Sequence, residues 1–130
     1  MPDIADARPA FPALAWFREL AGFLERDEDF RKHGAWLTAR IAFRVDQEMV
    51  TVAFDRGLVL EVAPSQGGGY DYLISGTRVQ WGCLFEAGWG LVRLYRSGTL
   101  TMRGDPVRMM QNWKAIFFIT EGMKAFARTA

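Results

Sequence analysis

The stretch Ser97-Gly98-Thr99-Leu100-Thr101-Met102-Arg103-Gly104-Asp105, with the long apolar run behind it, decides the fold that we expect for this chain. Its apolar and polar residues alternate, which is typical of a half-buried strand. Gly104 can supply a tight turn. Asp105 can accept hydrogen bonds from the free N–H groups of a helical first turn, and Pro106 suits the first helical position. The sequence therefore predicts a short strand, a turn and a C-terminal helix.

This C-terminal helix is expected to be apolar on more than one side. On a helical wheel its large side chains fall into two stripes, namely Met109, Met110, Trp113, Ile116 and Phe117, and then Ile119, Met123 and Phe126. A glycine inside a helix costs about 1 kcal/mol relative to alanine, so we expect a bend between Thr120 and Gly122. A helix of this kind is either deeply buried or faces something besides its own sheet.

Upstream, the sequence predicts a helix, three strands, a fourth strand and two short helical segments. Residues 12–26 carry apolar side chains at helical spacing, and the charged residues 27–33 form a turn or a second short helix. Apolar and polar residues alternate in three segments between residues 37 and 62, and their short connections favour an antiparallel meander. A fourth strand is expected at 70–75, before helical segments at 76–88 and 89–96.

A family resemblance rests on the closing residues. Gly98-x-Leu100, followed by Gly104-Asp105 and an amphipathic helix, resembles the final signature of the sterol carrier protein type 2 lipid-binding domains. From about Leu37 to the end, the order of expected elements is also similar to that family. Two departures are the bulky aromatic residues of the last helix and the glycine-rich loop 64–69.

The resemblance implies an α+β fold with an N-terminal helix, a three-stranded antiparallel meander, a crossover to a fourth strand, short helices, a fifth strand and a C-terminal helix. One sheet would be covered by helices around an apolar cavity. We expect residues 1–11 to form a flexible N-terminal arm and residues 12–130 to form the single domain.

Composition excludes several classes of protein. The 130 residues carry a net charge of +1, so no strong positive field is available to bind nucleic acid. A single cysteine rules out an intramolecular disulfide. No apolar run reaches the roughly 18 residues of a membrane span, and residues 1–10 do not resemble a secretory signal. The C-terminus differs from a Ser-Lys-Leu address. We therefore expect a cytoplasmic protein.

Few residues suggest catalysis. His33 is the only histidine, so neither a histidine metal cluster nor a Ser-His-Asp triad can be built, and a surface or capping role is expected. Cys83, among apolar neighbours, is expected to be a small core residue. Glu61, Asp71 and Glu86 could act as a general base only beside an apolar pocket, but strand alternation places Glu61 and Asp71 on the solvent face. We predict no catalytic residue, metal or cofactor.

The resemblance implies non-catalytic carriage of a hydrophobic ligand: a fatty acid, an acyl-CoA or a sterol-like lipid. Arg78, Arg93 or Arg96 could meet a carboxylate head group at the mouth of the cavity. One alternative is a partner or dimerisation module accessory to a lipid-metabolising enzyme, with a homodimer or a transient membrane or enzyme partner. Another is a small enzyme acting on an apolar substrate. The expected lipid-binding residues are Trp81, Leu84, Phe85, Leu91, Leu94, Tyr95, Met109, Met110, Trp113, Ile116 and Phe117.

Overall fold

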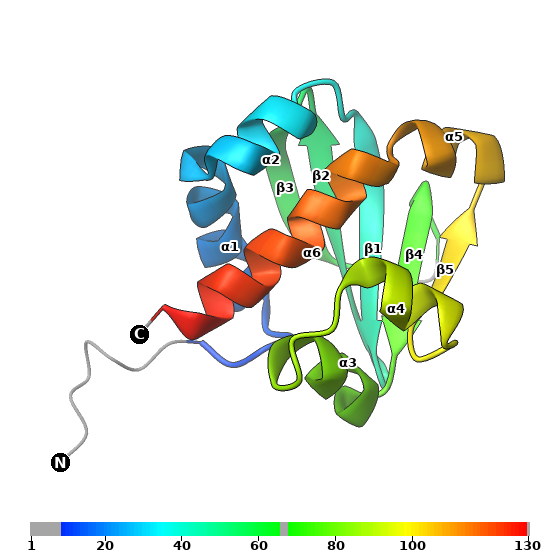
Figure 1. The fold of residues 1–130 in the computed structure, drawn as a ribbon. Helices are drawn as coiled ribbons and strands as arrows, with labels where there is room; N and C mark the ends of the chain where they lie inside the picture. The colour runs from blue at the N-terminus through cyan, green and yellow to red at the C-terminus, as the bar shows by residue number, and fades with distance from the viewer. Residues whose placement is uncertain (1–8, 66–67, 130) are drawn as a thin grey trace, which may run out of the picture.

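The computed structural model of the chain describes residues 9–65 and 68–129, which form an α+β domain (Figure 1). The helices are α1 (Leu14–Arg26), α2 (Glu28–His33), α3 (Arg78–Phe85), α4 (Leu91–Arg96), α5 (Pro106–Gln111) and α6 (Trp113–Arg128). The strands are β1 (Ala39–Val45), β2 (Glu48–Asp55), β3 (Leu58–Pro64), β4 (Tyr72–Gly76) and β5 (Thr101–Gly104). The expected order of elements is confirmed.

The five strands form one mixed sheet in the order β3-β2-β1-β4-β5. The first three strands are the predicted antiparallel meander. The chain then crosses over, and β4 pairs in parallel with β1 before β5 closes the sheet antiparallel to β4. Figure 1 shows α6 running diagonally across one face of this sheet, with α1 and α2 beside it.

Strand side chains alternate between this helix-covered face and the outer face. On β1, Ile41, Phe43 and Val45 are at most 1% exposed and pack beneath the helices, whereas Arg40 and Arg44 are exposed on the outer face. This alternation is the period-two pattern that the sequence displayed. Burial of the apolar face against α1, α2 and α6 is the main driving force for the fold.

Aromatic rings fill the space between α1, α3 and the sheet. Trp81 of α3 lies 5.5 Å from Phe11 and 6.3 Å from Phe43 between ring centroids, and Phe11 also lies 4.9 Å from Trp16. Residues 1–8 of the expected N-terminal arm lie outside the described residues. Its last residue, Phe11, packs against the domain.

The C-terminal helix differs from the prediction in where it is interrupted. It divides at Asn112 into α5 and α6, and the bend expected between Thr120 and Gly122 is wrong because α6 continues through those residues. Gly122 is explained by close packing instead: a Cβ there would lie 2.6 Å from Cδ2 of Leu24. The small residue lets α6 approach α1.

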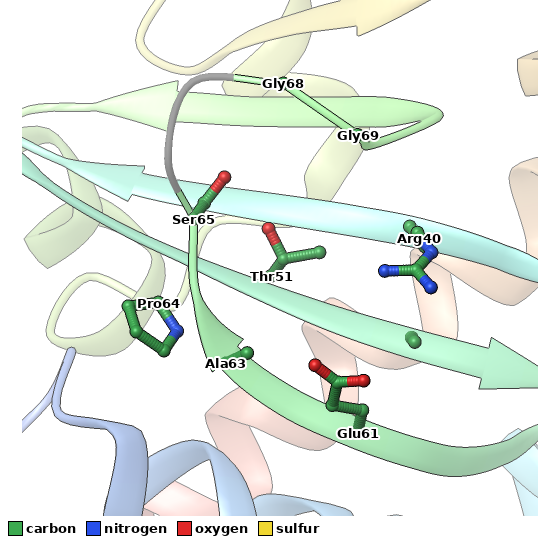
Figure 2. Close-up of a pocket in the computed structure, with 9 residues that line it drawn as sticks. Arg40, Thr51, Glu61, Ala63, Pro64, Ser65, Gly68 and Gly69 are labelled. Carbon is green, nitrogen blue, oxygen red and sulfur yellow. The ribbon is translucent and has the colours of Figure 1, made fainter.

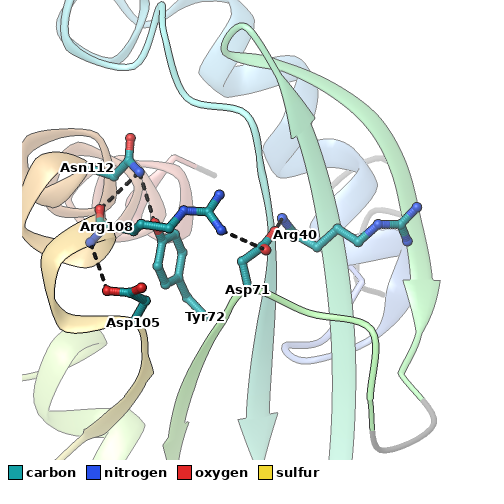
Figure 3. Close-up of polar contacts among 6 residues, drawn as sticks. All are labelled: Arg40, Asp71, Tyr72, Asp105, Arg108 and Asn112. Carbon is teal, nitrogen blue, oxygen red and sulfur yellow. Dashed lines mark hydrogen bonds and ion pairs between the residues drawn. The ribbon is translucent and has the colours of Figure 1, made fainter.

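The break at Asn112 is held by side-chain hydrogen bonds. Nδ2 of Asn112 donates to the hydroxyl oxygen of Tyr72 at 2.9 Å and to the carbonyl oxygen of Arg108 at 3.1 Å (Figure 3). Tyr72 is 1% exposed, so its hydroxyl would otherwise lack a partner. The contact ties the junction of α5 and α6 to the first residue of β4.

We predict that Tyr72→Phe lowers the free energy of unfolding by about 1 kcal/mol, the usual net contribution of one hydrogen bond. Asn112→Ala should lower it by about 2 kcal/mol, because it also removes the bond to the carbonyl oxygen of Arg108. Because both changes remove the same bond, the double variant should lose about 1 kcal/mol less than the sum of the two. Urea unfolding of the four proteins measures this. Tyr70→Phe is the matched control, since the Tyr70 hydroxyl forms no hydrogen bond to the described residues. Additive losses would contradict the proposed bond.

The strand, turn and helix predicted from residue 97 onward are confirmed in outline. Asp105 caps α5, its Oδ1 accepting from the N–H groups of Val107 at 2.9 Å and Arg108 at 3.3 Å, and Pro106 occupies the first turn. The strand is shorter than the alternation suggested, because the N–H of Leu100 donates to the carbonyl oxygen of Leu94 rather than to the sheet. Pairing in β5 therefore starts at Thr101.

Candidate functional site

The eleven predicted lipid-binding residues differ in burial. Six lie in the packed interior: Trp81, Leu84, Leu91, Leu94 and Ile116, which are at most 1% exposed, and Met109, which is 9% exposed. Three are half-buried, namely Phe85, Trp113 and Phe117. Two are exposed, Tyr95 at 49% and Met110 at 77%.

Three of these residues form a partly exposed aromatic seam between α4 and α6, which we define as Tyr95, Trp113 and Phe117. The Tyr95 and Trp113 rings meet edge to face, with centroids 6.0 Å apart. Phe117 lies one turn after Trp113, and residues four apart share one side of a helix. Leu94 and Ile116, which directly precede Tyr95 and Phe117 in the two helices, are fully buried. The seam residues are therefore the more accessible apolar side chains of these turns.

Met109 and Met110, though adjacent in sequence, point in different directions. Met109 lies beneath the start of β4, and its Cε would be 3.2 Å from a Cβ at Gly104. Met110 projects from α5 and has little contact with the interior. The predicted apolar stripe that began with both residues is therefore divided.

None of the four pockets that stand out among the described residues is lined by the eleven predicted residues. One of them, of about 180 Å³, lies on the outer face of the sheet (Figure 2). Arg40 of β1 and Glu61 of β3 lie on either side of Ala53 of the middle strand β2, because each of them is paired with Ala53 in the sheet register. Thr51 and Ser65 contribute hydroxyl groups. This pocket is polar, with one cation and one carboxylate.

The three carboxylates considered as bases lie near the surface. Glu61 is exposed on the outer face, as predicted. Asp71 is about one-third exposed; it accepts a hydrogen bond from the backbone N–H of Arg40 at 2.8 Å and lies 3.7 Å from Nη1 of Arg108 (Figure 3). Glu86 is exposed beside a surface pocket of about 380 Å³ on α3. None of the three is enclosed in the interior, so none stands as a base within an apolar cavity.

His33 and Cys83, the other two residues weighed for catalysis or metal binding, both contact neighbouring side chains. The half-buried His33 ring, in the last turn of α2, stacks on Phe118 with ring centroids 4.6 Å apart. Cys83 is half-buried and borders the pocket on α3, so it is less enclosed than a core residue. Among the described residues, no cluster of His, Cys, Asp and Glu is arranged to hold a metal ion. No described helix is long and apolar enough to cross a membrane.

Two of the three arginines expected at the cavity mouth are engaged elsewhere. Arg78 donates from Nη1 to the carbonyl oxygen of Phe11 at 3.1 Å, and the Arg93 guanidinium lies 3.7 Å from the centre of the Trp89 ring. The third, Arg96, is exposed at the end of α4. Arg96 follows Tyr95 directly, so it is the arginine next to the aromatic seam.

Sequence reasoning missed two features. Phe11 was assigned to the arm, although an apolar residue just before a helix start is a known packing signal. The pocket between Arg40 and Glu61 was also missed. Alternation predicted that both residues face outward, but only the strand register brings them to either side of Ala53.

Comparisons with known proteins give matches among solved structures. No protein-family model and no curated protein sequence matches the chain. Sterol carrier protein 2 superposes with a TM-score of 0.77 at 14% identity, covering 88% of this chain and 98% of that one. A conserved hypothetical protein from Thermus thermophilus superposes with a TM-score of 0.70 at 14% identity, covering 92% of this chain and 91% of that one. UbiJ-SCP2, a ubiquinone synthesis protein, superposes with a TM-score of 0.55 at 22% identity, covering 80% of this chain and 86% of that one.

The architecture thus defines a class of small α+β domain, in which helices cover one face of a mixed five-stranded sheet. Within that class, the chain has the sterol carrier protein 2 fold. The fold implied by the closing residues of the sequence is confirmed.

Proposed function

We propose that this chain binds a hydrophobic ligand without transforming it, and that the ligand inserts at the aromatic seam between α4 and α6. Fatty acids, acyl-CoA and sterol-like lipids have the required apolar part. The observation that carries the proposal is the half-buried state of Trp113 and Phe117, which lie between solvent and the apolar interior. Similarity of fold to sterol carrier protein 2 supports it.

Energetics favour a ligand with a long apolar part. Each buried methylene contributes about 0.8 kcal/mol of binding free energy, so a tail of about twelve methylenes would contribute about 10 kcal/mol. Part of this is offset by the translational, rotational and conformational entropy that the ligand loses on binding. None of the pockets described above is lined by a seam residue. Binding therefore requires the seam side chains to move apart, which is a shift to a less populated open state.

The direct test is native mass spectrometry of the purified protein, followed by solvent extraction and identification of bound molecules. Lipid at near one molecule per chain would support the proposal and identify the ligand class. A ligand-free mass that stays unchanged when long-chain fatty acids are added would overturn it.

We predict that Trp113→Ala weakens binding of a fluorescent fatty acid in solution about tenfold, because a large part of the apolar contact at the seam is removed. Trp36→Ala is the matched control. Trp36 is 88% exposed and lies in the loop between α2 and β1, so binding should be unchanged. Titrations with both variants, after circular dichroism confirms their fold, measure the difference. Equal affinities of the two variants would place the ligand elsewhere.

A second candidate is a partner module accessory to a lipid-metabolising enzyme. It is favoured by the filled interior, since Trp81, Leu84 and Leu91, three of the residues predicted to line a cavity, are fully buried. The fold similarity to a ubiquinone synthesis protein is consistent with such a role in a biosynthetic assembly. A ligand-free protein in the native mass experiment, together with a stable complex with an enzyme, would support this candidate over carriage.

A further inference from the structure

The pocket on the outer face of the sheet lies on the side away from α6 and is built from three neighbouring strands. We call it the outer-face pocket, and its lining includes Arg40, Thr51, Ala53, Glu61, Ala63 and Ser65. The alanines and the threonine are small side chains of β2 and β3 that form its floor, while longer side chains of β1 and β3 stand at its sides. This difference in size leaves a volume of about 180 Å³.

The two charged side chains of the outer-face pocket face each other without pairing. The sheet register places Arg40 and Glu61 on opposite sides of Ala53, so their backbones lie two strand spacings, or roughly 10 Å, apart. Figure 2 shows the guanidinium and the carboxylate turned toward the space between them. Among the described residues, neither side chain forms an ion pair or a hydrogen bond, and only the backbone N–H of Arg40 is engaged, by Asp71.

A buried hydroxyl group borders the same space. Oγ of Ser65 is buried and has no hydrogen-bond partner within the described part of the chain. Figure 2 shows the Thr51 hydroxyl at the same end of the pocket. A buried hydroxyl without a partner costs free energy, and in folded proteins such groups are usually satisfied by protein or by a bound molecule. Ser65 therefore indicates, independently of the two charged side chains, that this pocket accepts a polar ligand.

The surrounding charges disfavour a ligand that carries only an anionic group. An adjoining hollow shares Arg40 with the outer-face pocket and adds Asp55, Asp71 and Arg108. With Glu61, the region holds three carboxylates and two arginines. Arg108 lies 3.7 Å from Asp71, so it offsets that carboxylate rather than adding a second free cation. A complementary ligand must therefore match the Glu61 carboxylate as well as the Arg40 guanidinium.

We infer that the outer-face pocket binds a small zwitterion, with its anionic group at Arg40 and its ammonium group at Glu61. A guanidinium donates two parallel hydrogen bonds to a carboxylate or phosphate, and the Glu61 carboxylate accepts from an ammonium group. The Ser65 hydroxyl can donate to the first group or accept from the second. A few placed polar groups of this kind fix the orientation of a ligand. The inference does not rest on lipid binding at the aromatic seam, which lies on the helix-covered side of the sheet (Figure 1).

The test is a titration of isotope-labelled protein, followed by the NMR shifts of its backbone amides. The probes are 4-aminobutyrate, which carries both charged groups, and butyrate and butylamine, which carry one each, at the same ionic strength. Only the zwitterion can pair with both side chains, so it should bind at least about tenfold more tightly than either singly charged compound. Glycine and 6-aminohexanoate, which hold the two groups closer together and farther apart, extend the test over ligand length. The largest shifts should be those of Arg40, Glu61 and Ser65.

Two variants assign each charged group of the ligand to its partner. Arg40→Gln and Glu61→Gln should each weaken binding of the zwitterion about tenfold, because each removes one charged partner. In Arg40→Gln the zwitterion should bind no better than butylamine, and in Glu61→Gln no better than butyrate. Arg103→Gln is the matched control, because Arg103 is an exposed arginine on β5, at the opposite edge of the sheet from β3. It should bind like the wild type.

Four results would overturn the inference: no binding of any of the three zwitterions, equally tight binding of a singly charged compound to the wild type, equal binding by the three variants, or shifts confined to residues outside the pocket. Circular dichroism shows whether the variants are folded. Fatty acid titration separates the two proposals. Arg40→Gln should retain wild-type affinity for fatty acid, so failure at the seam and failure at the outer-face pocket give different results.

Discussion

Trp81→Ala should lower the free energy of unfolding by about 4 kcal/mol, because it deletes a large side chain from the packed interior. Trp81 is 1% exposed, and its ring lies within 6.4 Å of the Phe11, Phe43 and Phe85 rings. Its Nε1–H donates to the carbonyl oxygen of Arg44 at 2.9 Å, which joins α3 to β1. The substitution removes the apolar contacts, leaves a cavity and breaks this bond.

Two further variants separate these contributions. Trp81→Phe keeps a ring but loses the hydrogen bond and some volume, so we expect a loss of about 2 kcal/mol. Val79→Ala, two residues earlier on the exposed side of α3, should cost less than about 0.5 kcal/mol. Chemical denaturation of all three measures the differences. A loss below about 1 kcal/mol for Trp81→Ala would mean that Trp81 lines an open cavity rather than filling the core.

The elements that the sequence predicted well are those with a local physical signal. Alternation of apolar side chains located β1 and β2, because one face of each strand is buried and the other is not. It also located β3, but there Leu58 and Leu60 are exposed, because the pairing register with β2 shifts between Ala53 and Phe54. Asp105 and Pro106 located the start of α5, because a helix start needs a capping acceptor and tolerates proline. These signals are complete within a few residues and need no knowledge of distant parts of the chain.

The break at Asn112 lacked such a signal. It depends on a hydrogen bond to Tyr72, which is forty residues away in sequence. Gly122 misled the prediction because its helix propensity favours a bend. In the structure, Gly122 leaves room for the side chain of Leu24 of α1. The sequence alone does not reveal that these two residues are in contact, because the contact depends on how α1 and α6 pack.

The candidate site was predicted in part, for a similar reason. Apolarity and helical spacing identified residues that lie together around α3, α4 and α6, but they do not distinguish a core residue from a cavity wall. Leu84 and Leu91 are fully buried, whereas Tyr95 on the neighbouring turn of α4 is half exposed. That difference depends on tertiary packing.

Gly104→Ala should lower the free energy of unfolding by about 3 kcal/mol, from a strained backbone and a steric clash together. Gly104 has a φ of +152°, which side chains rarely adopt. A Cβ there would lie 2.6 Å from Cδ1 of Tyr72 and 2.7 Å from the carbonyl oxygen of Asp71. The second contact is with the backbone of Asp71, immediately before β4, and cannot be relieved by a rotamer change. β5 would have to move away from β4.

Gly98→Ala is the matched control for this variant. Gly98 also has a positive φ, +75°, but a Cβ there would meet nothing within 4 Å among the described residues. Gly98→Ala should therefore lower the free energy of unfolding by only about 1 kcal/mol, the cost of placing a side chain on a backbone with positive φ. Urea unfolding of both variants isolates the clash as the difference between them. Since Gly104 immediately precedes the cap of α5, Gly104→Ala should also disturb the tie between Asn112 and Tyr72, so its loss should fall when it is combined with Asn112→Ala. Equal losses for the two glycine variants would mean that β5 shifts freely, and that the packing of Gly104 on β4 does not position α5.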